Sequence, residues 1–167
     1  AEALHEGSVL AERVGERRLA ARGWREAGWI QFLRGRYDRA EATLARAAQL
    51  ADGDEEELAW IEVILGTCRS DVGDYANATR LLLSATARSE GLQSPEALAY
   101  TLTMHAKLHV LRDELDEAAI LLDRALELVD ARGLNSFRSW PESFRAEIDL
   151  RHGHVDAAAD AFEHAYA

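Results

Sequence analysis

The sequence predicts an all-α fold built from repeated pairs of antiparallel helices, and three observations lead to this prediction. One short pattern recurs at offsets of 38, 40 and 40 residues, as Gly35-Arg36-Tyr37-Asp38-Arg39-Ala40, Gly73-Asp74-Tyr75-Ala76-Asn77-Ala78, Asp113-Glu114-Leu115-Asp116-Glu117-Ala118 and Gly153-His154-Val155-Asp156-Ala157-Ala158. Self-similarity at such a period is typical of stacked helix-turn-helix repeats. The 167 residues include only two prolines and 12 aromatic residues, which leaves little material for a sheet. Abundant alanine, leucine, arginine and glutamate favour helix.

The repeat divides the chain into helices whose bounds can be estimated from the turn pattern. We expect helices near residues 1–14, 16–34, 37–51, 54–72, 75–90, 94–111, 115–132, 138–152 and 155–167. Between the pairs, Asp54 with Glu57 and Ser94 with Pro95 resemble helix starts. Glycines at 91 and 133, each followed by leucine, predict left-handed helix stops.

Small residues at fixed positions explain how the two helices of a pair approach each other. Gly28 and Gly66 are expected to face Ala40 and Ala78, because helix axes about 8–10 Å apart leave room only for small side chains. Leu44, Leu82, Leu122 and Phe162 then fill the space towards the next pair, so we expect all of these residues to be core.

In the first pair, Trp24, Gly28, Gly35, Tyr37, Ala40, Leu44 and Ala47 follow one another at spacings of 4, 7, 2, 3, 4 and 3. This order resembles the tetratricopeptide repeat, although the period is longer than the family's and no proline closes the repeats. The resemblance implies one right-handed superhelical solenoid of about four hairpins over residues 1–167. Its expected parts are a remnant of a preceding repeat at 1–15 and repeats at 16–53, 54–93, 94–134 and 135–167. Because the sequence starts with alanine and stops inside an expected helix, we expect a segment of a larger protein.

The resemblance also implies that the first helix of each repeat lines a concave groove that binds a ligand. Carried over position by position, the candidate groove residues are Arg22, Arg25, Trp29, Trp60, Ile64, Tyr100, Met104, Lys107, Trp140 and Phe144. Two columns stand out at 40-residue spacing: an aromatic one, Trp60, Tyr100 and Trp140, and a bulky apolar one, Ile64, Met104 and Phe144. Two interpretations stay open, since such columns either form an exposed binding stripe or pack each repeat on its predecessor.

Composition and motifs oppose several other classes of function. A net charge of −11 opposes direct contact with nucleic acid or an anionic membrane. His105 and His109 share a helix face but lack a third metal ligand, and Cys68 occupies a core position. We find no phosphate-binding loop and no nucleophile elbow. The prediction is therefore a non-catalytic protein with no cofactor and no metal.

The long repeats, rich in alanine and arginine, resemble the repeat arrays of bacterial LuxR-type and signal-transduction ATPase regulators. By that resemblance the chain is a cytoplasmic sensing or interaction segment that binds a protein, a peptide or a small effector. It would touch neither nucleic acid nor membrane. A free-standing adaptor or peptide-binding protein is the alternative. Exposed apolar ends of the repeat array predict a possible homodimer.

Overall fold

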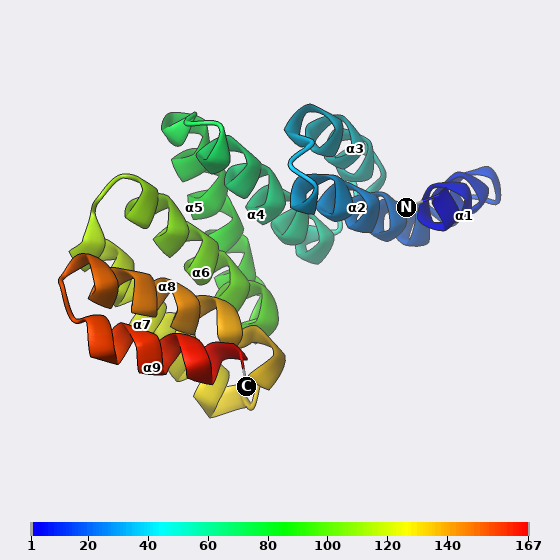
Figure 1. The fold of residues 1–167 in the computed structure, drawn as a ribbon. Helices are drawn as coiled ribbons and strands as arrows, with labels where there is room; N and C mark the ends of the chain where they lie inside the picture. Colours follow the sequence, from blue (N-terminus) through cyan, green and yellow to red (C-terminus); the bar gives the residue numbers. More distant parts are fainter. Residues whose placement is uncertain (1, 167) are drawn as a thin grey trace. The chain divides into compact units, whose positions relative to one another are not determined.

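The computed structural model describes residues 2–166, with side chains from residue 3 to residue 165. Over these residues the chain is helical and contains no strand (Figure 1). The helices are α1 (Glu2–Arg13), α2 (Arg17–Leu33), α3 (Tyr37–Leu50), α4 (Glu55–Asp71), α5 (Tyr75–Leu92), α6 (Pro95–Leu111), α7 (Leu115–Arg132), α8 (Ser139–Arg151) and α9 (Val155–Tyr166). A short 3₁₀ turn, η1 (Asn135–Phe137), precedes α8. The predicted all-helical fold is confirmed, whereas η1 was not expected.

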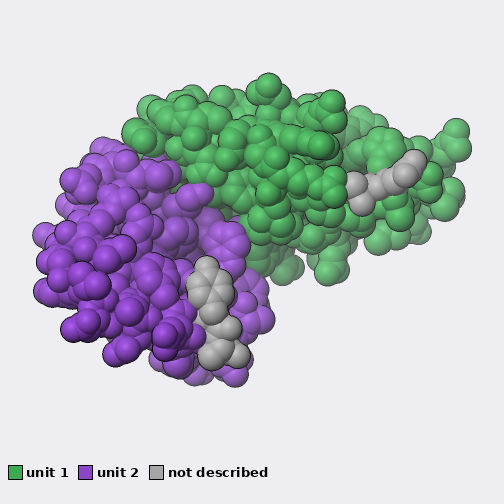
Figure 2. Space-filling view, in the orientation of Figure 1, with its two compact units in different colours: residues 1–88 green, residues 89–167 purple. Residues whose placement is uncertain are grey.

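The chain divides into two compact units, residues 1–88 and 89–167 (Figure 2). In the first unit, α1 packs on α2, α2 on α3, and both α2 and α3 on α4. In the second unit, α6 packs on α7, both of these on α8, and α8 on α9. Consecutive helices therefore pack against one another, as expected of a helical repeat. Ala1 and Ala167, which the predicted first and last helices include, lie outside the described residues.

The helix pairs close over small residues, as the sequence predicts. Ala40, Ala78 and Ala118 are fully buried at the crossings, and so are Leu44, Leu82 and Leu122. A Cβ atom added at Gly28 would lie 2.7 Å from Leu44 Cγ, closer than real Cβ contacts allow. The glycine is thus required by the approach of α3 to α2.

One turn type recurs between the helices of residues 2–166, and its hydrogen-bond pattern occurs there seven times rather than the four times that the repeated pattern predicts. The left-handed residue of each turn donates its N–H to the carbonyl three residues back, and the next residue donates to the carbonyl five residues back. The left-handed residues of these turns are Gly15, Gly35, Gly73, Gln93, Asp113, Gly133 and Gly153. The turn at Gly15 lies at the break predicted between helices 1–14 and 16–34, which is confirmed. It was not recognised as a copy of the repeated pattern, because it precedes Gly35 by 20 residues instead of about 40.

The helix ends confirm some of the predicted caps and correct others. Asp54 caps α4, accepting a hydrogen bond of 3.2 Å from the Glu57 amide. Pro95 is the first residue of α6, and Gly133 ends α7 in the left-handed region, at φ +66°. The stop predicted at Gly91 is wrong: Gly91 lies within α5, and Gln93 takes the left-handed conformation at φ +54°. Within residues 2–166, none of the helices combines the length and apolar composition that a membrane crossing requires.

Replacing Ala118 by leucine should lower the free energy of unfolding by about 1–3 kcal/mol, because the added methylene groups have no space at the crossing of α6 and α7. Ala131→Leu, on the exposed surface of α7, should change it by less than about 0.5 kcal/mol. Chemical denaturation of both variants checks this. Equal stability of Ala118→Leu and wild type would contradict the assigned crossing.

Replacing Asp113 by glycine should raise the free energy of unfolding by about 0.5–1 kcal/mol, since Asp113 adopts φ +63°, a conformation that glycine takes in the turns at Gly15, Gly35, Gly73 and Gly153. The Arg151 ion pair that is lost is 3.3 Å long, and the Asp113 side chain is 81% exposed, so it stabilises little. As a control, Asp116→Gly in the first turn of α7 should destabilise. A loss of stability in Asp113→Gly would show that the ion pair outweighs the backbone strain.

Candidate binding surfaces

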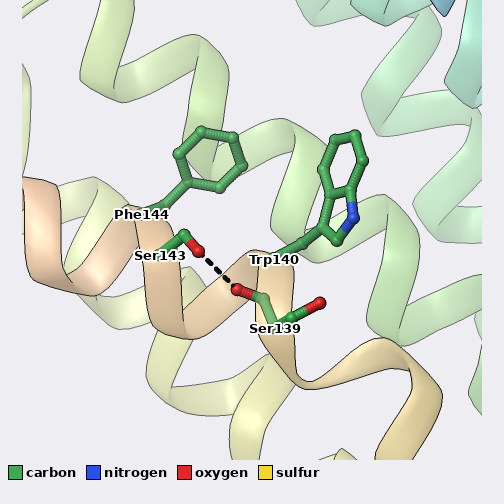
Figure 3. A pocket seen from close by; sticks show the side chains of 4 residues that line it. All are labelled: Ser139, Trp140, Ser143 and Phe144. Carbon is green, nitrogen blue, oxygen red and sulfur yellow. Dashed lines mark hydrogen bonds between the residues drawn. The ribbon is translucent and has the colours of Figure 1, made fainter. Parts of the chain in front are cut away.

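The clearest candidate site in the second unit is an apolar hollow along one face of α8. Ser139, Trp140, Ser143 and Phe144 line it, and its volume is about 420 Å³. These residues share a face because they are spaced three and four residues apart on the helix. Figure 3 shows the two aromatic rings standing on the same side of α8, while the Ser143 hydroxyl donates to the Ser139 carbonyl at 2.7 Å. The hydroxyl is thereby turned back to its own helix, which leaves the rings as the main contact surface.

The two rings differ in how much they offer to a ligand. Trp140 is 37% exposed. Phe144 is half-buried against the core cluster of Ala106, Val110, Ala118, Leu122 and Ile148. Trp140 also meets Tyr100 of α6 edge to face, with ring centroids 6.3 Å apart. Tyr100 and Trp140, predicted from the 40-residue period to form a column, therefore lie next to each other in the second unit.

In the first unit, Arg25 and Trp60 form a second aromatic feature, between α2 and α4. The Arg25 guanidinium lies 5.7 Å from the Trp60 ring centroid, a cation–π geometry. Its Nε donates to Glu57 Oε1 at 2.6 Å, and its Nη1 lies 3.0 Å from Glu26. The side chains of Arg25 and Glu57 are only 12% and 11% exposed. Arg25 is therefore held by its own neighbours and fixes α2 to α4.

Around this pair lies a small polar hollow of about 160 Å³, lined by Arg18, Arg22, Arg25, Asp54, Glu56, Glu57 and Trp60. Arg18 is engaged with Asp54 at 2.9 Å. Arg22 is exposed, and it makes no hydrogen bond or ion pair with the side chains of residues 3–165. Arg18 and Arg25 in this hollow are engaged in ion pairs, so Arg22 is the arginine of its lining that can pair with a ligand.

The remaining predicted groove residues are mostly covered. Ile64 and Met104 are 2% and 0% exposed, so in this structure they offer no surface to a ligand and act as packing residues. Trp29 stacks on Phe32 with centroids 5.0 Å apart. Trp29 and Lys107 are half-buried. The expected continuous apolar column therefore reaches the surface only at Phe144, where it joins the α8 hollow.

His105 and His109 of α6 stack with ring centroids 5.0 Å apart. Burial, and secondly the neighbouring His109, lower the pKa of His105 from 6.5 to about 4. His109 Nδ1 lies 2.7 Å from a Glu114 carboxylate oxygen. Among the described residues, no group of three histidine, cysteine, aspartate or glutamate side chains gathers as a metal site would require.

Sequence reasoning missed two features of these surfaces. The buried pair of Arg25 and Glu57 lies 32 residues apart in sequence and has no counterpart in the other repeats, so no periodic signal marked it. A hollow between α1 and α2 was missed because the turn at Gly15 was not recognised as a copy of the repeated turn. The sequence Val14-Gly15-Glu16, which matches Val72-Gly73-Asp74 in residue type, was the available signal.

Comparison with known proteins finds no matching family model and no matching curated protein.

Replacing His105 by glutamine should reduce the decrease in the free energy of unfolding that wild type shows as the pH falls from 6.5 to 4. The folded-state pKa of His105, about 4, lies below its unfolded value of 6.5, so its neutral form stabilises the fold fully above pH 6.5. That stability is lost as the pH falls from 6.5 towards 4, by up to about 3 kcal/mol. Urea denaturation of both proteins across this pH range checks the difference. Parallel curves for wild type and His105→Gln would contradict a buried neutral imidazole.

Proposed function

We propose that this chain is a non-catalytic interaction module that binds a segment of a partner protein or peptide. The proposed architecture is a right-handed superhelical array of about four tetratricopeptide-like hairpins. Consecutive helix packing and the recurring turn support this part of the proposal. So do the buried small residues at the helix crossings.

The observation that best supports binding is the α8 hollow with its two aromatic rings. An exposed tryptophan beside an apolar recess is a common anchor point in protein interfaces, because aromatic side chains bury much area and lose little entropy. The hollow's size suits one bulky apolar side chain of a partner. Trp140 would form its exposed wall, and Phe144 would form its floor.

We further propose that the module senses a protein, peptide or effector within a cytoplasmic bacterial regulator of the LuxR or signal-transduction ATPase type. The support for this finer proposal is the resemblance of the repeats in period and composition. A reading frame that encodes an ATPase domain before the repeats, or a DNA-binding domain after them, would favour it over a free-standing adaptor.

Trp140→Ala should weaken peptide binding at least about tenfold, because truncation of a central aromatic anchor costs about 1.4 kcal/mol or more. The same substitution should lower the free energy of unfolding by much less than the loss of about 3–5 kcal/mol that truncation of a core tryptophan causes. The measurement combines selection of binders from a random peptide display library with titration calorimetry and denaturation. Trp60→Ala, tested alongside, should also destabilise by less than a core tryptophan.

The matched control is Ile120→Ala, which removes an apolar side chain that is 69% exposed on α7, outside the hollow. Peptides selected on wild type should bind this variant with unchanged affinity. Selection of no peptide, or equal binding to Trp140→Ala and wild type, would refute the α8 hollow as the binding site. A loss of several kcal/mol in both tryptophan variants would show that the aromatic column is core.

A further inference from the structure

The first unit has a hollow at its turns, between the start of α3 and the end of α4. Its volume is about 280 Å³, and it is lined by Gly35, Arg36, Tyr37, Asp38, Arg39 and Val72. The Tyr37 hydroxyl donates a hydrogen bond of 3.2 Å to Asp71 Oδ2, which ties α3 to α4 at this place. Helix α1 packs on α2, and α4 packs on α3. The hollow therefore lies at the turn edge of a helix pair that has a packed neighbour on each side.

Part of the lining of this turn hollow is apolar and accessible. Val72, which directly follows α4, is 51% exposed. Tyr37 is half-buried, and its ring lies 6.2 Å from that of Phe32, measured between centroids. The contact with Phe32 and the bond to Asp71 together hold the Tyr37 ring in place. An apolar side chain that enters the hollow would therefore meet a fixed aromatic wall and an exposed valine.

Basic side chains lie beside this apolar part. Residues 34–39 carry three arginines and one aspartate, a net charge of +2 in a chain whose net charge is −11. Arg36 and Arg39 belong to the lining, and both are exposed. Neither guanidinium group makes a hydrogen bond or ion pair with residues 3–165. Two positive charges are thus available to an occupant of the hollow, next to the single carboxylate of Asp38.

The equivalent turn between α4 and α5 shows that the fold does not require these arginines. Asp74 and Asn77 hold the positions there that Arg36 and Arg39 hold here. Asp74 accepts hydrogen bonds from the backbone amide of Asn77 at 3.4 Å and from its side-chain amide at 2.8 Å. Arg36 makes no such bond at the start of α3. The arginine therefore adds charge to the hollow and contributes no capping bond to its helix.

We infer that the turn hollow binds an acidic segment of a partner protein. An apolar side chain of that segment contacts Val72 and Tyr37, and neighbouring carboxylates pair with Arg36 and Arg39. A short acidic segment suits the site better than nucleic acid does, because a long polyanion would be repelled by the chain's net charge of −11. The inference rests neither on the α8 hollow nor on the function proposed for it.

Three labelled peptides with blocked termini test the chemistry of the occupant. Gly-Glu-Leu-Glu-Leu-Glu-Gly has both expected features. Gly-Gln-Leu-Gln-Leu-Gln-Gly lacks the carboxylates, and Gly-Glu-Ser-Glu-Ser-Glu-Gly lacks the apolar side chains. Fluorescence anisotropy at low ionic strength should show that the first peptide binds at least about fivefold more tightly than either of the others. Its affinity should fall as salt is added, because exposed ion pairs are screened.

A charge reversal tests the site. Arg36→Asp should weaken binding of the first peptide at least about fivefold, because it places a carboxylate opposite those of the peptide. Its free energy of unfolding should not fall, since the new aspartate can accept the bond that Asp74 accepts in the next turn. The matched control is Arg132→Asp, at an exposed arginine of α7, which changes the net charge by the same amount and should leave binding unchanged.

Two further variants separate the apolar contact from the charged one. Val72→Ala should weaken binding of the first peptide and leave binding of the serine peptide unchanged, because only the first peptide has a side chain that packs on Val72. Asp38→Asn removes the carboxylate from the lining, so it should strengthen binding of both acidic peptides by about twofold. Circular dichroism and denaturation establish that each variant is folded before its affinity is measured.

Several outcomes would overturn the inference. One is the absence of binding by the first peptide at millimolar concentration, and another is equal affinity for the glutamate and glutamine peptides. Equal weakening by Arg36→Asp and Arg132→Asp would show attraction to overall charge rather than to this hollow. Trp140→Ala should bind the first peptide like wild type, and loss of binding in that variant would place the contact at the α8 hollow. Tighter binding of a single-stranded thymidine oligonucleotide than of the first peptide would refute the peptide as occupant.

Discussion

The close approach of paired helices is the constraint on which the rest of the structure depends. A Cβ at Gly66 would stand 2.8 Å from Leu82 Cγ, as at Gly28 and Leu44, so each leucine fills the space that a glycine leaves. In the second unit, Ala106 holds the position that Gly28 and Gly66 hold in the first unit, and it packs in one core cluster with Leu122. Alanine is slightly larger than glycine but still small enough for the helices to approach. This pairing of a small residue on the first helix with a large one on the second sets which faces of α2, α4, α6 and α8 point away from their partners. Those faces are the ones left for the next helix or for a ligand.

Most helix bounds could be predicted from the sequence because glycine, aspartate and proline act locally. The start of α4 at Asp54 and the stop of α7 at Gly133 need only their neighbours in sequence. The stop of α5 was misplaced because Gly91 tolerates helix as well as the left-handed region, and the helix continues through Gly91 to Leu92. The break at Gly15 was predicted, but its likeness to the other turns was overlooked, because a search at one period misses a copy at half that period. Because this turn reverses the chain before α2, α2 packs on α1 as well as on α3.

The candidate site could be predicted only in part, because helical periodicity tells which residues share a face but not what covers that face. Trp140 and Phe144 were found by their spacing, and both line the α8 hollow. Met104 was assigned to the same kind of face and is fully buried. Helix α6 held a signal against that assignment. Its apolar residues lie on more than one side of the helix, and a helix that is apolar all round is buried. They include Ala97, Ala99, Leu102, Met104, Ala106, Leu108 and Val110.

In the first unit, the buried ion pair of Arg25 and Glu57 both fixes the packing of α2 on α4 and determines which charges remain on the surface. Burying two charges costs free energy that their attraction offsets only with good geometry, so such a pair is weak support for stability itself. Its bond of 2.6 Å does fix the position of α2 against α4, because leaving either charge buried alone would cost about 3–5 kcal/mol. The same guanidinium lies over Trp60, so the orientation of that ring depends on the pair. With Arg25 held in this way and Arg18 engaged by Asp54, Arg22 is the arginine of the polar hollow that can pair with an incoming carboxylate. The charge that a partner meets on this face is therefore set by the ion pairs that build the fold.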